Sequence, residues 1–406
     1  MFKVKKVVFC LLVCLIASYA FAMSPKEDGL YNGVTNLHYK PYVAFPDEGL
    51  DTYLFYNPSA LASEDFLISF PSFNVTSYNM AKSLESSSFA KALSDMTKFK
   101  FTKSGLISYL TVLADSAGSG YSNVISGDLG FGFVLNSFAF GVHGMINIHS
   151  MPKSDDSETQ ELLGTNFVPE LLYGISVGYG YRIADTNSFT FDVGGVIHLN
   201  RKSYVMSIDV NTLVKLINKS TELDVLPARG GFGFPIDLNA SMGFFNEKLK
   251  LNLNINGLNG VYYMYNYPSI RDAMAFSDGS DFYVMYAPFD VSLNASYTPE
   301  FKIANPTFYL GIDDIVAYLR DDIKKENPGL EFIKHLNLRL KINIYNIAVI
   351  NLAYSMGYPQ LGLSLGYVGN KIEFVYGYKE AGAGYGQKPV DFFTVRFRFG
   401  YTPNEL

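Results

Sequence analysis

Strict two-residue alternation of apolar and polar side chains recurs along most of this chain and restricts its fold more than any other feature. In residues 393–401 every second side chain is apolar, and the positions between are polar or glycine. The apolar set is Phe393, Val395, Phe397, Phe399 and Tyr401. Because successive side chains of a β-strand point to opposite faces, each such run of about ten residues predicts a strand with one apolar face.

About fourteen strands of this kind can be placed along the chain. They are expected at 66–79, 128–136, 137–149, 170–183, 188–201, 232–244, 248–257, 286–297, 305–314, 335–345, 347–357, 360–368, 371–379 and 391–401. Their connections mostly alternate between short and long, from the turn at Asn136-Ser137 to the long stretches 202–231, 258–285 and 315–334. Membrane barrels have short turns at one end and long loops at the other, whereas a soluble β-sandwich predicts no such regularity.

We therefore predict an all-β fold, a transmembrane antiparallel β-barrel of about 14 strands. Beyond the N-terminal region no stretch offers the roughly 18 apolar residues of a membrane-spanning helix, so strands would have to cross the bilayer. Short helices are expected in the outer loops, at 81–97, 105–115, 212–218 and 316–325.

The first 22 residues have the pattern of a secretory signal peptide. Lys3, Lys5 and Lys6 precede an apolar run at 7–17, and Ala20-Phe21-Ala22 forms a small-residue cleavage site. A retained anchor helix is the alternative. Cleavage would remove both cysteines and leave 29 basic and 38 acidic residues, a net charge of −9. Such an acidic chain is not expected to bind nucleic acid.

Residues 23–65 precede the first strand and do not alternate. Pro41, Pro46 and Pro58 oppose a strand there, and the many aromatic residues favour a segment folded into the barrel. We expect four parts: a signal peptide at 1–22, an N-terminal plug or hatch at 23–65, a barrel at 66–401 and a tail at 402–406.

The polar face of the strands supplies the candidate functional residues. Those expected to face the lumen are Asp237, Arg339, Lys341, Glu373, Arg396 and Arg398, and the same pattern gives His143 and His198 a lumen-facing or structural place. Mixed charge suggests paired ions that hold a plug and stiffen the wall, because unpaired buried charges are costly. A polar permeation path, or an arginine that binds a carboxylate, is the other interpretation. No catalytic grouping, cofactor motif or metal-ligand spacing stands out, so neither an enzyme, a cofactor nor a metal site is predicted.

The run Asn57-Pro58-Ser59-Ala60-Leu61-Ala62 resembles an element that precedes the first strand of FadL-like outer-membrane β-barrels, the long-chain fatty-acid transporter type. Related barrels occur in spirochaetes and among the shuttle proteins of the type IX secretion system. Residues 386–389 and 392–401 also resemble the last hairpin of these barrels. The resemblance implies a place in the outer membrane and a plug motif at Asn57, Pro58, Ser59 and Ala60.

Several functions fit this fold. The resemblance implies uptake of hydrophobic small molecules such as long-chain fatty acids, with outer-membrane lipid around the barrel. The alternative is a secretion shuttle or surface protein that binds a protein partner through its long outer loops. A general diffusion pore is a further alternative, although a plug and so few strands oppose a wide channel.

Overall fold

The computed structural model describes 45–46, 49–78, 122–152, 165–186, 188–205, 208–209, 226–275, 277–286, 289–301, 304–319, 328–345, 347–355, 357–367, 369–380 and 389–401. The expected signal peptide and the tail at 402–406 lie outside these residues, as do the helices expected at 81–97, 105–115 and 212–218. No helix in the described part of the chain is long and apolar enough to span a bilayer.

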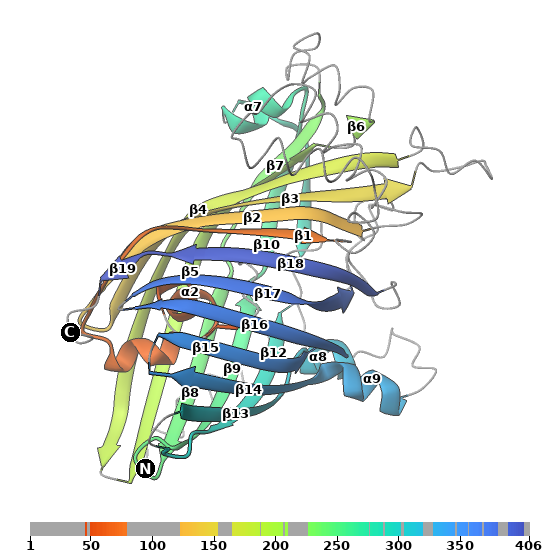
Figure 1. Cartoon of the computed structure of the whole chain (residues 1–406). Helices are drawn as coiled ribbons and strands as arrows, with labels where there is room; N and C mark the ends of the chain where they lie inside the picture. Colours follow the sequence, from red (N-terminus) through yellow and green to blue (C-terminus); the bar gives the residue numbers. More distant parts are fainter. Residues whose placement is uncertain are drawn as a thin grey trace.

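Fourteen antiparallel strands close into a barrel, which confirms the predicted fold (Figure 1). Each strand pairs with the next, and the first pairs with the last, where Phe73 lies opposite Phe397 and Tyr78 opposite Phe392. The strands are β1 Phe66–Tyr78, β2 Ser122–Leu135, β3 Phe138–Pro152, β4 Thr165–Thr186, β5 Phe189–Val205, β8 Ile236–Phe244, β9 Leu249–Leu258, β12 Asp290–Tyr297, β13 Ala304–Ile312, β14 Leu336–Ile344, β15 Ala348–Ser355, β16 Tyr358–Tyr367, β17 Asn370–Glu380 and β18 Pro389–Arg398. A short β19, Gly400–Tyr401, continues the last strand along β1.

The outer face of the barrel is apolar and the inner face is largely polar. On β16, Leu361, Leu363 and Leu365 are exposed on the outside, while Gln360 and Ser364 are buried on the inside. A soluble protein rarely exposes so continuous an apolar band, whereas a bilayer favours it. The alternation seen in the sequence is therefore the division between lipid and lumen.

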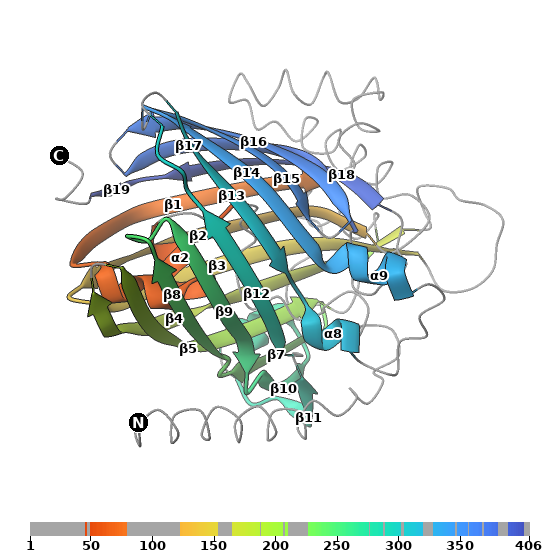
Figure 2. The same cartoon turned by 90° about the horizontal axis from the view of Figure 1, so that it is seen from below.

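The two ends of the barrel differ in their connections. At the end we call the turn end, tight turns join the strands, and Asn136 and Ser137 have φ values of 49° and 65° between β2 and β3. At the opposite loop end lie α8, Ile315–Leu319, and α9, Pro328–His335 (Figures 1 and 2). The helix expected at 316–325 overlaps α8, whereas α9 was not predicted from the sequence.

Four further strands extend beyond the barrel at the loop end, where long loops were predicted. The stretch 258–285 forms β10, Val261–Tyr267, the helix α7, Ile270–Met274, and β11, Ser280–Tyr286. Part of 202–231 is also strand, because β5 continues to Val205 and β7 spans Ala228–Gly233, while Ile208–Asp209 form β6. The prediction failed here because both faces are apolar: Tyr262 and Met264 pack in an inner cluster, and Tyr263 lies exposed outside.

Candidate functional site

A short segment lies inside the barrel near its turn end and packs against the wall. We call residues 49–63 the inner segment; it consists of α2, Leu50–Phe55, and a 3₁₀ helix η1, Pro58–Ser63. Figures 1 and 2 both show α2 enclosed by strands. Proline is favoured in the first turn of a helix, so Pro58 starts η1 after α2 has ended. Leu54, Phe55 and Leu61 are buried against side chains of the wall.

Glycines in the wall leave room for the backbone of this segment. A Cβ atom on Gly180 would lie 2.3 Å from the backbone nitrogen of Ala62, and one on Gly194 would lie 2.3 Å from the carbonyl carbon of Pro58. No side chain can occupy such space, so β4 and β5 form a smooth seat for η1. The backbone N–H of Ser59 also donates to Asn239 Oδ1 of β8, at 3.1 Å.

Phe45 is seated on the opposite wall. Its ring fills the space over Gly362 of β16, where a Cβ would lie 2.3 Å from Phe45 Cε2. The Arg339 guanidinium of β14 lies 4.9 Å from the centre of the same ring, and donates to Asn351. In a barrel of fourteen strands β4 and β5 face β15 and β16 across the lumen, so η1 and Phe45 are seated on opposite sides of it.

Charged side chains link the inner segment to the last strands. Arg396 Nη2 of β18 lies 2.6 Å from Asp51 Oδ2 of α2, and Arg396 Nη1 lies 3.8 Å from Glu373 Oε2 of β17. Both Arg396 and Glu373 are almost completely buried. A buried guanidinium between two carboxylates has its charge compensated, so this cluster pins α2 to the wall.

A second buried polar network lies beneath Phe55. His198 of β5 joins Ser176 of β4 to Asp237 of β8, with distances of 2.7 Å from Nδ1 to Ser176 Oγ and 3.1 Å from Nε2 to Asp237 Oδ2. The Phe55 ring stacks on His198 at 5.0 Å and meets His143 of β3 edge-on at 5.0 Å. Serine, histidine and aspartate in this order resemble a hydrolase triad. Here all three are fully buried, and Phe55 covers the histidine, so no substrate reaches the serine in this arrangement.

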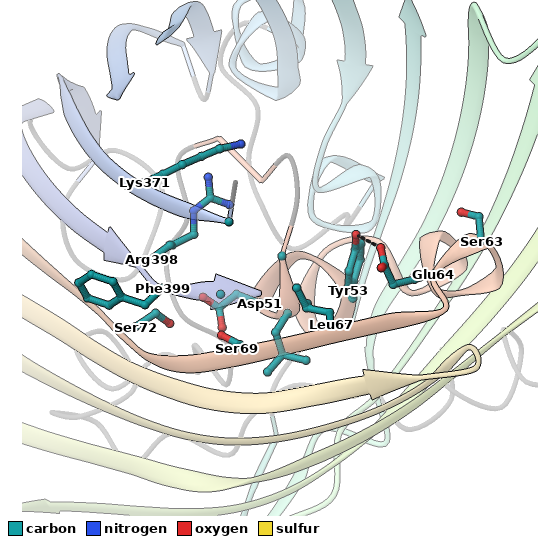
Figure 3. Close-up of a pocket in the computed structure, with 14 residues that line it drawn as sticks. Asp51, Tyr53, Ser63, Glu64, Leu67, Ser69, Ser72, Lys371, Arg398 and Phe399 are labelled. Carbon is teal, nitrogen blue, oxygen red and sulfur yellow. Dashed lines mark hydrogen bonds between the residues drawn. The ribbon is translucent and has the colours of Figure 1, made fainter. Parts of the chain in front are cut away.

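A cavity of about 300 Å³ lies beside the inner segment at the turn end (Figure 3). Lys371 and Arg398 reach it from the wall, while Tyr53 and Glu64, joined by a 2.7 Å hydrogen bond, border it from the other side. The remaining lining residues are Gly49, Leu50, Asp51, Ser63, Leu67, Ser69, Ser72, Gly369, Phe399 and Gly400. The lining therefore combines apolar side chains with two cations, Lys371 and Arg398, and two carboxylates, Asp51 and Glu64.

The candidate residues of the sequence fall into separate contacts. Glu373 and Arg396 come together, Asp237 joins the histidine network, Arg339 holds Phe45, and Arg398 borders the cavity. Lys341 is half-buried on β14.

The motif residues lie at the start of η1. Pro58 and Ser59 are buried, Asn57 Oδ1 accepts a 2.9 Å bond from the Ser59 hydroxyl, and Ala60 is half-buried. Sequence reasoning included Phe45 only as one of the aromatic residues that favour a plug, and it missed Asp51 and the wall glycines as parts of the site. The glycines carried a usable signal, because Gly178, Gly180 and Gly194 occupy inward positions of their strands.

Within the described ranges, no group of three or more histidine, cysteine, aspartate or glutamate side chains is placed to hold a metal ion. No protein-family model and no curated protein matches the sequence.

Several solved barrels resemble the structure. The CymD monoaromatic hydrocarbon channel is 10% identical, covers 92% of this chain and 98% of its own, and has a TM-score of 0.43. The Pseudomonas putida toluene transporter TodX is 7% identical, with coverage of 87% and 94% and a TM-score of 0.39. A Pseudomonas aeruginosa FadL homologue is 9% identical, with coverage of 86% and 93% and a TM-score of 0.38.

Proposed function

We propose that this protein is an outer-membrane barrel that takes up hydrophobic small molecules such as long-chain fatty acids, and that the inner segment is its movable plug. It acts as a transport protein rather than an enzyme, with its turn end in the periplasm and its loop end outside the cell. The observation that carries the proposal is that the inner segment is seated on β4 and β5, while Phe45, which precedes it, is seated on β14 and β16 across the lumen.

The contacts that hold the inner segment could break without unfolding the barrel. The wall strands pair with one another through their own backbone, and none of these pairings depends on the inner segment. The segment is held by ring contacts, glycine seats and the Asp51–Arg396 ion pair. Its displacement would break these contacts and leave the sheet closed.

The turn-end cavity supports a route for amphipathic acids. Leu50, Leu67 and Phe399 offer apolar surface to a hydrocarbon chain, and Arg398 and Lys371 offer donors to a carboxylate. Binding pockets of this kind combine apolar walls with a few placed polar groups, and about 300 Å³ is within their usual range.

The test is to identify and measure bound ligand. Protein purified in mild detergent is extracted, and co-purified molecules are identified by mass spectrometry; binding of a fluorescent long-chain fatty acid is then titrated. We expect stoichiometric lipid and a Kd that rises about tenfold in Arg398→Gln, the loss of one charged hydrogen bond. Lys250→Gln is the matched control, because Lys250 lies in an exposed ion pair with Glu247 away from the cavity. An equal effect of both variants, or no enriched ligand, would refute the proposal.

A second function is favoured by the strands beyond the barrel. Tyr263, Tyr265 and Phe282 form an exposed aromatic cluster there, with ring-centre distances of 6.2 Å and 5.3 Å to Phe282. Aromatic side chains are enriched where proteins bind partners. A stoichiometric protein that co-purifies without enriched lipid, and is lost in Phe282→Ser, would favour the secretion-shuttle or surface-protein alternative.

A further inference from the structure

The two helices α8 and α9, which we call the helix pair, carry exposed apolar side chains at the loop end. Leu319 of α8 is 65% exposed, and Phe332 and Ile333 of α9 are 37% and 42% exposed. Figures 1 and 2 both show the helix pair at the ends of β13 and β14. Several large apolar side chains exposed on one connection between strands indicate a surface that binds something other than water.

The helix pair is held in a defined position on these two strands. The Asp313 N–H donates to the His335 carbonyl at 2.8 Å, and His335 Nδ1 donates to the Asp313 carbonyl at 2.9 Å. The Tyr318 ring of α8 meets the rings of Phe332 and His335 edge-on, at 5.7 Å and 5.5 Å. These contacts fix the direction in which the exposed side chains point.

The first helix of the pair packs on the lipid-facing side of the wall. Val316 of α8 contacts a cluster that contains Ile255 of β9 and Phe289, which precedes β12. Ile255 belongs to the outer face of β9, because Leu253, two residues earlier, is paired with Leu293, which is exposed on the outside of β12. The helix α8 therefore covers part of the same face of the sheet that contacts lipid along the rest of the barrel.

The strands that carry the helix pair are short for a membrane wall. β13 and β14 have nine residues each. At about 3.3 Å per residue and a tilt of about 35–45°, such a strand rises only about 19–22 Å along the barrel axis, whereas the apolar band of an outer-membrane barrel is about 25 Å tall. At the turn end the exposed Tyr345 directly follows β14, as expected of an aromatic girdle at one interface. The helix pair then lies at the opposite interface.

Continuity with the wall identifies the partner of this surface. α8 begins three residues after β13, and α9 leads directly into β14. Leu310 of β13 and Leu338 of β14 are paired with each other and exposed on the outside. The exposed side chains of the helix pair thus extend an apolar surface that faces lipid acyl chains, which is how helices with an apolar side bind in the plane of an interface.

We propose that the helix pair is a lipid-binding element in which Leu319, Phe332 and Ile333 insert between acyl chains of the outer leaflet, just below the headgroups. It anchors the side of the barrel where β13 and β14 are too short to reach the headgroup layer. The proposal concerns contact with lipid and does not depend on the proposed transport function.

Single tryptophans in lipid vesicles test this contact directly. The chain contains no tryptophan, so Ile333→Trp and Leu319→Trp each report from one position. The vesicles contain phospholipids brominated either near the headgroup or near the end of the acyl chain, because bromine quenches indole fluorescence on contact. We expect a loss of intensity that is larger for bromine near the headgroup, since interfacial helices lie about 5–10 Å into the boundary between headgroups and chains. Iodide on both sides of the vesicle should leave the intensity unchanged.

Two control positions calibrate the measurement. Leu363→Trp, exposed on the outside in the middle of β16, should lose most intensity to bromine near the chain ends. Asp278→Trp, exposed between α7 and β11, should be quenched by iodide and not by bromine, and it controls for the preference of tryptophan itself for interfaces. Quenching of Ile333→Trp by iodide alone would overturn the proposal. Protection from both quenchers would also overturn it, because protein rather than lipid would then cover the helix pair.

A spin label gives the same depth without an indole. Both cysteines of the chain lie in the expected signal peptide, so Ile333→Cys and Asp278→Cys can each carry one nitroxide. Oxygen concentrates in the acyl chains, whereas a nickel chelate stays in the water. We expect oxygen to relax the label at Ile333→Cys more strongly than the nickel chelate does, and the reverse at Asp278→Cys. The same ratio at both positions would contradict the proposal.

Discussion

Replacing Gly194 by valine should release the inner segment and leave the barrel intact. The new Cβ would lie 2.3 Å from Pro58 C and 2.5 Å from Ser59 N, against an ordinary contact distance of at least 3.4 Å. The η1 helix must therefore withdraw by about 1 Å or more, because both clashing atoms are backbone. Valine suits a β-strand, so the sheet itself is not expected to suffer.

The size of the effect follows from what the withdrawal breaks. The Ser59–Asn239 hydrogen bond is lost, which costs about 1 kcal/mol, and Leu61, now fully buried, loses part of about 2 kcal/mol of burial. Together these losses reach at most about 3 kcal/mol, which would shift the balance between the seated and the displaced segment by up to about 100-fold.

Conductance in planar bilayers measures this balance. The matched control is Gly144→Val, because a Cβ at Gly144 meets nothing within 4 Å. We expect frequent openings in Gly194→Val and none beyond the wild-type level in Gly144→Val. If the two variants conduct alike, the segment does not block the lumen and the reasoning fails.

Three other perturbations address stability. Arg396→Gln should lower the free energy of unfolding by about 3–5 kcal/mol in urea titrations, because it leaves the carboxylates of Asp51 and Glu373 without the cation that they share, and adding Asp51→Asn should restore part of it; a loss no greater than that of a surface variant would contradict this. Phe45→Ala should remove about 3 kcal/mol or more of packing free energy and so make the inner segment more sensitive to limited proteolysis. Phe45→Leu should be cleaved more slowly than Phe45→Ala, because leucine keeps part of the packing. Equal cleavage of the two variants would contradict a role for Phe45 in holding the segment. At the turn end, burial opposes ionisation of Glu247, but the bond and charge of Lys250 outweigh it and hold the Glu247 pKa below its usual 4.5. Stability from this group is therefore present above pH 4.5 and is lost as the pH falls through the lowered pKa, so urea midpoints should fall in acid less steeply in Glu247→Gln than in wild type.

The barrel wall was predictable because each strand has an apolar outer face and a polar inner face, so that apolar and polar residues alternate along its sequence. The run at Leu336–Ile344 shows this, since apolar and polar residues alternate over its whole length. The rule fails where both faces are apolar, as in Val261–Tyr267, whose inward Tyr262 and Met264 pack in a cluster.

The site was less predictable because its contacts join residues far apart in the chain. Alternation placed Arg396 and Glu373 on the inner face, but nothing in the sequence pairs Arg396 with Asp51, 345 positions away. Ser176 is a second example, because the sequence shows only a small residue on the inner face, whereas the fold places its hydroxyl against His198. The local pattern predicts which strand residues face the lumen, whereas the pairs that they form depend on the strand register and on the position of the inner segment.

The two-sided seating of the inner segment has a consequence for the order of assembly. The inner segment packs on β2, β3, β4, β5 and β8, whereas Arg396 of β18 holds its Asp51, and Phe45, which precedes it, packs on β14, β16 and β17; the strands from β14 to β18 are made last. An unclosed sheet can therefore grip the segment only on its first side. The pairing of β18 with β1 closes the wall and brings Arg396 to Asp51 in the same step. The barrel must therefore close around the inner segment, and the last strand can form all of its contacts only if this segment already lies inside.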